Sequence, residues 1–253
     1  MDRKRFSEIC LRYRERIHER IGIGTLGEKT LHAVLKDYFE EDRAFHEVKV
    51  GKYYADIARN GNIFEIQTRD LYKLSEKIST FIVENQVTVV YPIALSKKIF
   101  WINPETGECL SQRKSSKKGK EIDVLPELYG LRKFLLCKGF RVCLLLMDVN
   151  EYRIPDGQGK DRKKHATKLD RYPTDLVDEI YLEKAEDYCR FLPENLPPEF
   201  SSTDFRIAAK CDFYTARISL NILSKIGLIQ EIGRKERRKF YTISDFSEKF
   251  THL

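Results

Sequence analysis

The sequence predicts an α/β fold in which a mixed sheet is flanked by helices, followed by a small C-terminal domain. Over the first 150 residues, segments with apolar residues at helical spacing alternate with β-branched apolar runs. Asn60 and Gly61 separate two of these runs, and this dipeptide is a strong signal for a two-residue hairpin turn. A proline-rich segment at 192–200 then predicts a linker between two domains.

The linker defines the predicted domain boundaries. The first domain covers residues 1–191, with its core at about 21–150, and the second covers residues 201–253. The chain has 253 residues, a net charge of +7 and a pI near 9.0. This basic balance favours a polyanionic partner such as nucleic acid.

Composition also excludes several classes of protein. The six cysteines are scattered without a C-x-x-C pair, which argues against a disulfide framework or a zinc site. The N-terminus lacks the apolar stretch of a secretory signal, and no apolar run approaches the ~20 residues of a membrane span. We therefore expect a cytoplasmic protein with no membrane partner.

The first domain begins with two predicted helices. Apolar residues recur at helical spacing over 1–20, and glycines then interrupt the pattern. Thr25 is the expected N-cap of the second helix, because Glu28 follows it by three positions in a capping-box pattern. This helix is expected to end near residue 40, before a strand at 45–50 and the hairpin.

The hairpin places two acidic residues opposite each other. Counting outward from the turn gives the pairs Arg59–Asn62, Ala58–Ile63, Ile57–Phe64 and Asp56–Glu65. The last is a non-hydrogen-bonded pair, with Cα atoms about 4.5 Å apart. Facing carboxylates destabilise a sheet unless something offsets their repulsion, and a divalent cation would do so. The alternative is an ordinary solvated sheet face that tolerates the pair.

The rest of the first domain continues the alternation of helices and strands. The patterns predict helices at 71–82, 125–137 and 175–190, strands at 86–94, 98–103 and 140–149, an exposed basic loop at 111–120 and a polar loop at 153–172.

The last fifty residues contain two predicted helices, at 202–210 and 213–226, followed by strands at 228–232 and 240–243. A basic loop at 233–239 joins the two strands. This order resembles the winged-helix domains of many DNA-binding regulators, in which the second helix enters the major groove. The expected DNA-binding residues are Tyr214, Thr215, Arg217, Asn221, Arg234, Lys235, Arg237 and Arg238. A solvated wing or a protein-docking module is the alternative.

The first 150 residues resemble the PD-(D/E)XK nuclease superfamily, which has the restriction-endonuclease-like fold. The resemblance lies in a helix with Glu28, a strand with Asp56, a strand with Glu65, Ile66 and Gln67, and a following helix. The segment 24–28 is similar to the archaeal Holliday-junction resolvase branch. The resemblance implies that Asp56, Glu65 and the Ile66 carbonyl bind Mg²⁺ or Mn²⁺, with Glu28 reaching the metal through water.

Gln67 departs from the superfamily pattern, which usually has a lysine there. Some restriction enzymes carry the same E-x-Q variant, so the expected catalytic residues are Glu28, Asp56, Glu65 and Gln67. The sequence thus favours a Mg²⁺-dependent DNA endonuclease assisted by a winged helix. The alternatives are an inactive nuclease-fold DNA-binding or regulatory protein and an RNA-directed nuclease. Because family members often act as dimers, the resemblance is also compatible with a homodimer.

Overall fold

The computed structural model describes residues 1–20, 30–157, 166–236 and 238–244. The chain divides into two compact units. Unit 1 contains residues 1–67, 89–120 and 144–180, and unit 2 contains residues 68–88, 121–143 and 181–253.

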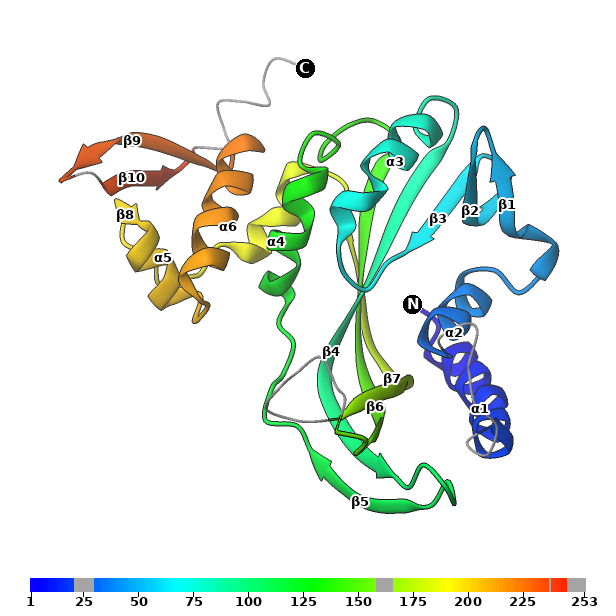
Figure 1. Cartoon of the computed structure of the whole chain (residues 1–253). Coiled ribbons are helices and arrows are strands. Elements are labelled where there is room, and N and C mark those ends of the chain that lie inside the picture. The colour runs from blue at the N-terminus through cyan, green and yellow to red at the C-terminus, as the bar shows by residue number, and fades with distance from the viewer. Residues whose placement is uncertain (21–29, 158–165, 237, 245–253) are drawn as a thin grey trace. The chain divides into compact units, whose positions relative to one another are not determined.

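The main sheet has seven strands in the order β1-β2-β3-β4-β6-β7, with β5 paired to β4 (Figure 1). Its strands are β1 (His46–Val50), β2 (Tyr53–Arg59), β3 (Asn62–Ile66), β4 (Gln86–Ile102), β5 (Cys109–Lys114), β6 (Phe140–Ile154) and β7 (Thr167–Leu182). The first four strands are neighbours in sequence order, and helices precede and follow the β1-β2-β3 meander. The predicted α/β class, with a large mixed sheet flanked by helices, is confirmed.

Unit 1 contains the helices α1 (Arg3–Arg20) and α2 (Thr30–Phe39) and the short η1 (Arg43–Phe45). The ring of Phe6 in α1 packs edge-on against Tyr38 of α2, with ring centroids 5.4 Å apart. Phe39 of α2 stacks on Phe64 of β3, with ring centroids 5.0 Å apart. These contacts fix α2 against the hairpin. Thr25 and Glu28 lie outside the described residues.

Unit 2 contains the helical segments η2 (Leu71–Leu74), α3 (Ser75–Phe81), η3 (Glu121–Val124), α4 (Leu125–Leu128), η4 (Tyr129–Leu131) and η5 (Ala185–Phe191). Its C-terminal part consists of β8 (Phe200–Ser201), α5 (Ser202–Ala208), α6 (Phe213–Lys225), β9 (Ile229–Lys235) and β10 (Arg238–Ile243). The last three strands form a separate sheet in the order β8-β10-β9.

Local signals explain the C-terminal helices. Ser201 and Asp204 form a capping box at the start of α5. Asp212 caps α6 by accepting the backbone N–H of Thr215 at 2.9 Å. At the other end, Gly227 has φ +84°, the left-handed conformation that ends many helices. The expected order of helix, turn, helix and hairpin is therefore present.

The division into units does not follow the predicted boundary at 192–200. Residues 68–88 and 121–143 belong to the same unit as the C-terminal region, and α4 contacts α6. Phe200, the last residue of the predicted linker, is fully buried. The contact between α4 and α6 joins distant parts of the chain, which a boundary based on prolines cannot reveal. The predicted domain boundary itself stays a prediction.

Several predicted elements differ in the structure, among them the polar loop at 153–172, part of which belongs to β7. The predicted helix at 175–190 is wrong over 175–182, where β7 continues to Leu182, and only its last part is helical, as η5. The buried residues Asp170, Tyr172, Leu176, Ile180 and Leu182 lie on one face of this strand, although positions 174 and 178 of the same face are exposed. The spacing of Leu176 and Ile180 fits a helix equally well, which explains the error. Part of the basic loop at 111–120 belongs to β5, and the predicted strands 86–94 and 98–103 form one strand, β4.

None of the described helices combines the length and the apolar character that a membrane span requires.

Candidate functional site

The hairpin turn adopts the predicted geometry. Asn60 has φ 49° and Gly61 has φ 75°, so both residues are left-handed, as a type I′ turn requires. The register is also as predicted. The observed pairs are Arg59–Asn62, Ala58–Ile63 and Ile57–Phe64.

Beyond these pairs, two carboxylates take part in the contacts between β2 and β3. The backbone N–H of Ile66 donates to Oδ2 of Asp56 at 2.7 Å, and the N–H of Asp56 donates to Oε1 of Glu65 at 3.3 Å. The regular ladder expected at Asp56–Glu65 is thus replaced by contacts between side chains and backbone. The structure does bring the two acids together, and backbone amides orient both.

A histidine that the sequence reasoning missed joins this pair. His32 of α2 places Nε2 3.2 Å from Oδ2 of Asp56. Its side chain is 27% exposed and that of Asp56 is 15% exposed, whereas Glu65 is only 2% exposed. His32 follows Glu28 by four positions, a spacing that would place both on one face of a helix. That spacing was the available signal.

Gln67 and Glu28 are the other two residues of the predicted site. The N–H of Gln67 donates to the carbonyl of Val90 at 3.0 Å. Hydrogen bonding to β4 therefore extends one residue beyond the end of β3. The side chain of Gln67 is half-buried. Glu28 lies outside the described residues, and its predicted water-mediated contact stays a prediction.

This arrangement has the donor chemistry that Mg²⁺ prefers. Asp56 and Glu65 supply carboxylate oxygens, and the backbone of Ile66 lies beside them. Within the described part of the chain, no group of three or more His, Cys, Asp or Glu residues is placed to bind a metal ion. Metal binding by Asp56, Glu65 and the Ile66 carbonyl stays a prediction.

The C-terminal region of unit 2 contains a basic groove of about 750 Å³. Its lining includes Arg132, Arg217, Asn221, Lys225, Arg234 and Arg238. Four of these residues were predicted to bind DNA, while Arg132 comes from the segment after η4. Glu231 also lines the groove, where its carboxylate pairs with Lys239 at 2.6 Å and with Arg234 at 3.6 Å.

Two residues of the predicted DNA-binding face lie elsewhere. Thr215 was expected on the outer face of α6, but it is 5% exposed and its hydroxyl donates to Asp212 at 2.8 Å. The error arises because Thr215 belongs to the cap of α6. Tyr214 is exposed, but it lines a separate hollow beside Tyr72.

Lys235 and Arg237 are the remaining two of the predicted DNA-binding residues. Lys235 is exposed and places its ammonium 3.4 Å from Glu199. Arg237 lies outside the described residues, so its predicted contact with DNA stays a prediction.

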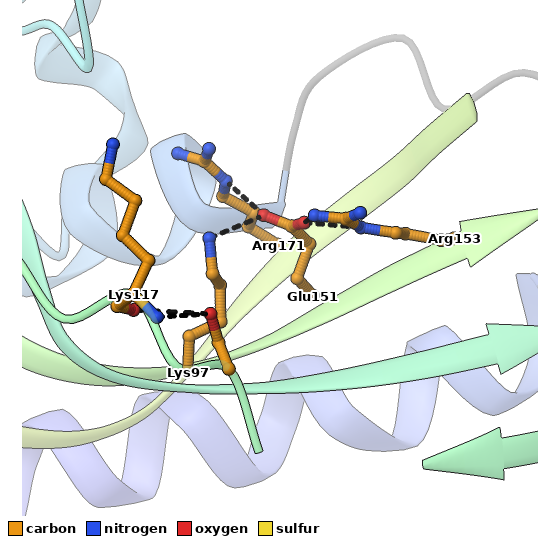
Figure 2. A network of polar contacts seen from close by, with 6 residues as sticks. Lys97, Lys117, Glu151, Arg153 and Arg171 are labelled. Carbon is orange, nitrogen blue, oxygen red and sulfur yellow. Dashed lines mark hydrogen bonds and ion pairs between the residues drawn. The ribbon is translucent and has the colours of Figure 1, made fainter. Parts of the chain in front are cut away.

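A second polar network in unit 1 was not anticipated from the sequence. Figure 2 shows three cations around the carboxylate of Glu151, from three strands of the sheet. Lys97 of β4 donates to Oε2 at 3.3 Å, and Arg171 of β7 donates to the same oxygen at 3.2 Å. Arg153 lies on β6, as Glu151 does, and donates to Oε1 through Nε at 2.7 Å and again through a second nitrogen.

The network shifts the pKa values of its members. Burial alone would raise the pKa of Glu151, but hydrogen bonds from Arg153 and the charges of Lys97 and Arg153 outweigh it. The pKa falls from 4.5 to about 2. Burial lowers the pKa of Lys97, and Glu151 only partly opposes that effect. Glu151 is therefore ionised throughout the neutral range.

Comparison with known proteins identifies the family. A family model described as "Domain of unknown function (DUF8091)" matches residues 29–183. The chain belongs to this family. An uncharacterised protein of Treponema pallidum (strain Nichols) is 26% identical over 220 residues, which is 87% of this chain and 86% of the relative. No solved structure matches the chain.

The DUF8091 region contains both polar networks. Asp56, Glu65 and Gln67 lie within it, as do His32 and Glu151. The match begins directly after Glu28 and ends before α5, α6 and the β9-β10 hairpin, while Arg132 of the basic groove lies within it.

Proposed function

We propose that this protein is a Mg²⁺-dependent endonuclease that hydrolyses phosphodiester bonds in DNA. The observation that carries the proposal is the adjacency of Asp56 and Glu65 on neighbouring strands, with backbone amides holding both carboxylates. Such a pair supplies hard oxygen ligands from a rigid support.

The order of elements supports a nuclease of the restriction-endonuclease-like type. A helix leads into the β1-β2-β3 meander, and a helical segment then leads to β4, which lies next to β3. Asp56 and Glu65 occupy the second and third strands, as in the PD-(D/E)XK pattern. The helix-turn-helix and hairpin of unit 2 support the assignment of a winged helix in the same way.

In this mechanism the chain positions the reacting groups. Asp56, Glu65 and the Ile66 carbonyl would hold the cation, and His32 would fix the orientation of Asp56 through Oδ2. A bound Mg²⁺ supplies a water of lowered pKa and neutralises charge on the phosphate. Gln67, two positions after Glu65 on the same face of the strand, would orient that water without accepting its proton.

The basic groove supplies the DNA-binding part of the proposal. Arg217 and Asn221 are one turn apart on α6 and both line the groove, so they are placed to contact base edges. Arg234 and Arg238 line it from the hairpin and suit phosphate contacts. These phosphate contacts would make binding depend on salt concentration.

The direct test is cleavage of plasmid and branched DNA by the full-length protein with Mg²⁺ or Mn²⁺. Asp56→Asn and Glu65→Gln should each reduce the cleavage rate by on the order of 100-fold or more, because each removes a charged ligand. Glu105→Gln is the matched control, since it neutralises an exposed turn carboxylate in the same unit. Cleavage that persists unchanged in Asp56→Asn would remove the proposed site.

A second candidate is a catalytically inactive nuclease-fold protein that binds DNA in a regulatory role. The low exposure of Glu65 and the replacement of the usual lysine by Gln67 favour it. It predicts duplex binding in EDTA through the basic groove, with no cleavage of any substrate. A labelled RNA of the same sequence, tested in parallel, would identify an RNA-directed nuclease instead.

A further inference from the structure

The network around Glu151 is rich in positive charge. Among the described residues, this one buried carboxylate is paired with three cations, which leaves a surplus of two positive charges within the network. The side chain of Arg153 is 5% exposed, whereas those of Lys97 and Arg171 are 17% and 40% exposed. The surplus therefore lies on the solvent side, where an anion could reach it.

A backbone segment adds a further cation to this side. The N–H of Ser115 donates to the carbonyl of Lys97 at 2.7 Å, and the N–H of Gly119 donates to that of Ala94 at 2.8 Å. A Cβ on Gly119 would lie 2.7 Å from the Ala94 oxygen, so this close approach requires glycine. The bonds fix Lys117 near β4, and Figure 2 shows its side chain extending in the same direction as Lys97 and Arg171.

Lys168 shows the same electrostatic imbalance. It is an exposed residue of β7, and burial is the first cause that lowers its pKa. Glu151 opposes the shift, but repulsion from Arg171, Lys97 and Arg153 adds to it. An anion bound on this side would relieve that repulsion.

We propose that Lys97, Lys117 and Arg171 form a phosphate-binding site, with Lys168 at its edge. Glu151 and Arg153 are positioning residues. Glu151 holds Arg171 by Nε and leaves the two terminal nitrogens of its guanidinium to bind an oxyanion, a geometry that suits phosphate. The site does not include Asp56 or Glu65, so the proposal does not rest on the metal site.

The single tryptophan of the chain allows a direct binding assay. The guanidinium of Arg153 lies 5.9 Å from the ring centroid of Trp101, so changes in the network should alter its fluorescence. We would titrate the full-length protein in EDTA at constant ionic strength with inorganic phosphate and, separately, with a 20-base-pair DNA duplex. We expect both ligands to change the signal.

Substitutions identify the groups that bind. Arg171→Gln should weaken phosphate binding about tenfold, since a charged hydrogen-bonding partner is lost. Lys117→Gln should weaken it severalfold, and its exposed position makes it the variant that keeps the fold. Lys98→Gln is the matched control, because this exposed lysine is next to Lys97 on β4 but alternation places it on the other face.

The two ligands separate the possible sources of the phosphate group. Loss of duplex binding together with a salt dependence reduced by about one unit in slope would identify a nucleic-acid backbone. Loss of phosphate binding with unchanged duplex binding would identify a free phosphate ligand. Lys117→Gln and Arg171→Gln variants that bind both ligands as Lys98→Gln does would overturn the proposal. Asp56→Asn should bind phosphate normally, so failure of the nuclease proposal would remain distinguishable.

Discussion

Glu65 and Glu151 are both almost fully buried in unit 1, but their contacts differ in kind. Glu65 accepts a backbone amide, and its neighbour Asp56 carries a second carboxylate. Glu151 is bound by three cationic side chains. An amide orients a carboxylate without carrying a net charge, whereas cations neutralise it. The first arrangement suits the recruitment of a cation, and the second suits the recruitment of an anion.

The largest difference should be in stability. Glu151→Leu leaves three cations without their common partner and should destabilise the protein by about 3–5 kcal/mol. Glu65→Gln removes one of two adjacent negative charges and should change stability by less than about 1 kcal/mol without metal. Urea unfolding followed by circular dichroism measures both. Equal losses would contradict the distinction between the two glutamates.

Acid should affect the Glu151 network selectively. The pKa of Glu151 is about 2 in the folded protein and 4.5 as the ordinary value, so its stabilisation is complete above pH 4.5. It is lost as the pH falls toward 2, by up to about 3 kcal/mol. Comparing the acid unfolding of wild type and Glu151→Gln measures the contribution. Parallel pH profiles would show that Glu151 is not responsible.

Metal should stabilise the hairpin network alone. Mg²⁺ at 100 times its Kd should add about 2.7 kcal/mol, seen as a rise of a few degrees in Tm. Asp56→Asn should abolish this rise, whereas Lys117→Gln should retain it, because Lys117 belongs to the other network. A Tm that responds equally to Mg²⁺ in both variants would indicate binding elsewhere.

The smallest expected difference is between alanine variants of two glycines, Gly61 in the hairpin turn and Gly119 in the segment next to β4. Gly61 has φ +75° and a Cβ there would meet nothing within 4 Å, so Gly61→Ala costs only backbone strain of about 1 kcal/mol. Gly119→Ala forces its segment away from Ala94 and should weaken phosphate binding as well. Urea unfolding and Trp101 fluorescence give the two readouts. Normal phosphate binding by Gly119→Ala would show that the segment does not contribute.

Local chemistry determines which features could be predicted from the sequence. The hairpin register follows from Asn60 and Gly61 alone, because a type I′ turn fixes the pairing. His32 reaches Asp56 only through the packing of α2 on the hairpin. The Glu151 network joins residues 97, 151, 153 and 171, which become neighbours only when the strand order β4-β6-β7 is known.

The same reasoning explains the error at β7. Leu176 and Ile180 are four residues apart and positions 174 and 178 are exposed, which matches the spacing of a helix. The even spacing of Asp170 and Tyr172 upstream is the local signal that favours a strand.

The division of the chain into units has a consequence for its synthesis. The chain passes from one unit to the other after residues 67, 88, 120, 143 and 180. The first unit therefore cannot be completed on the ribosome until residue 180 has emerged, when only residues 68–88 and 121–143 of the second unit have been made. Those two segments must wait for residues 181–253 before their own unit can be completed. Neither unit can be expressed as a single continuous fragment.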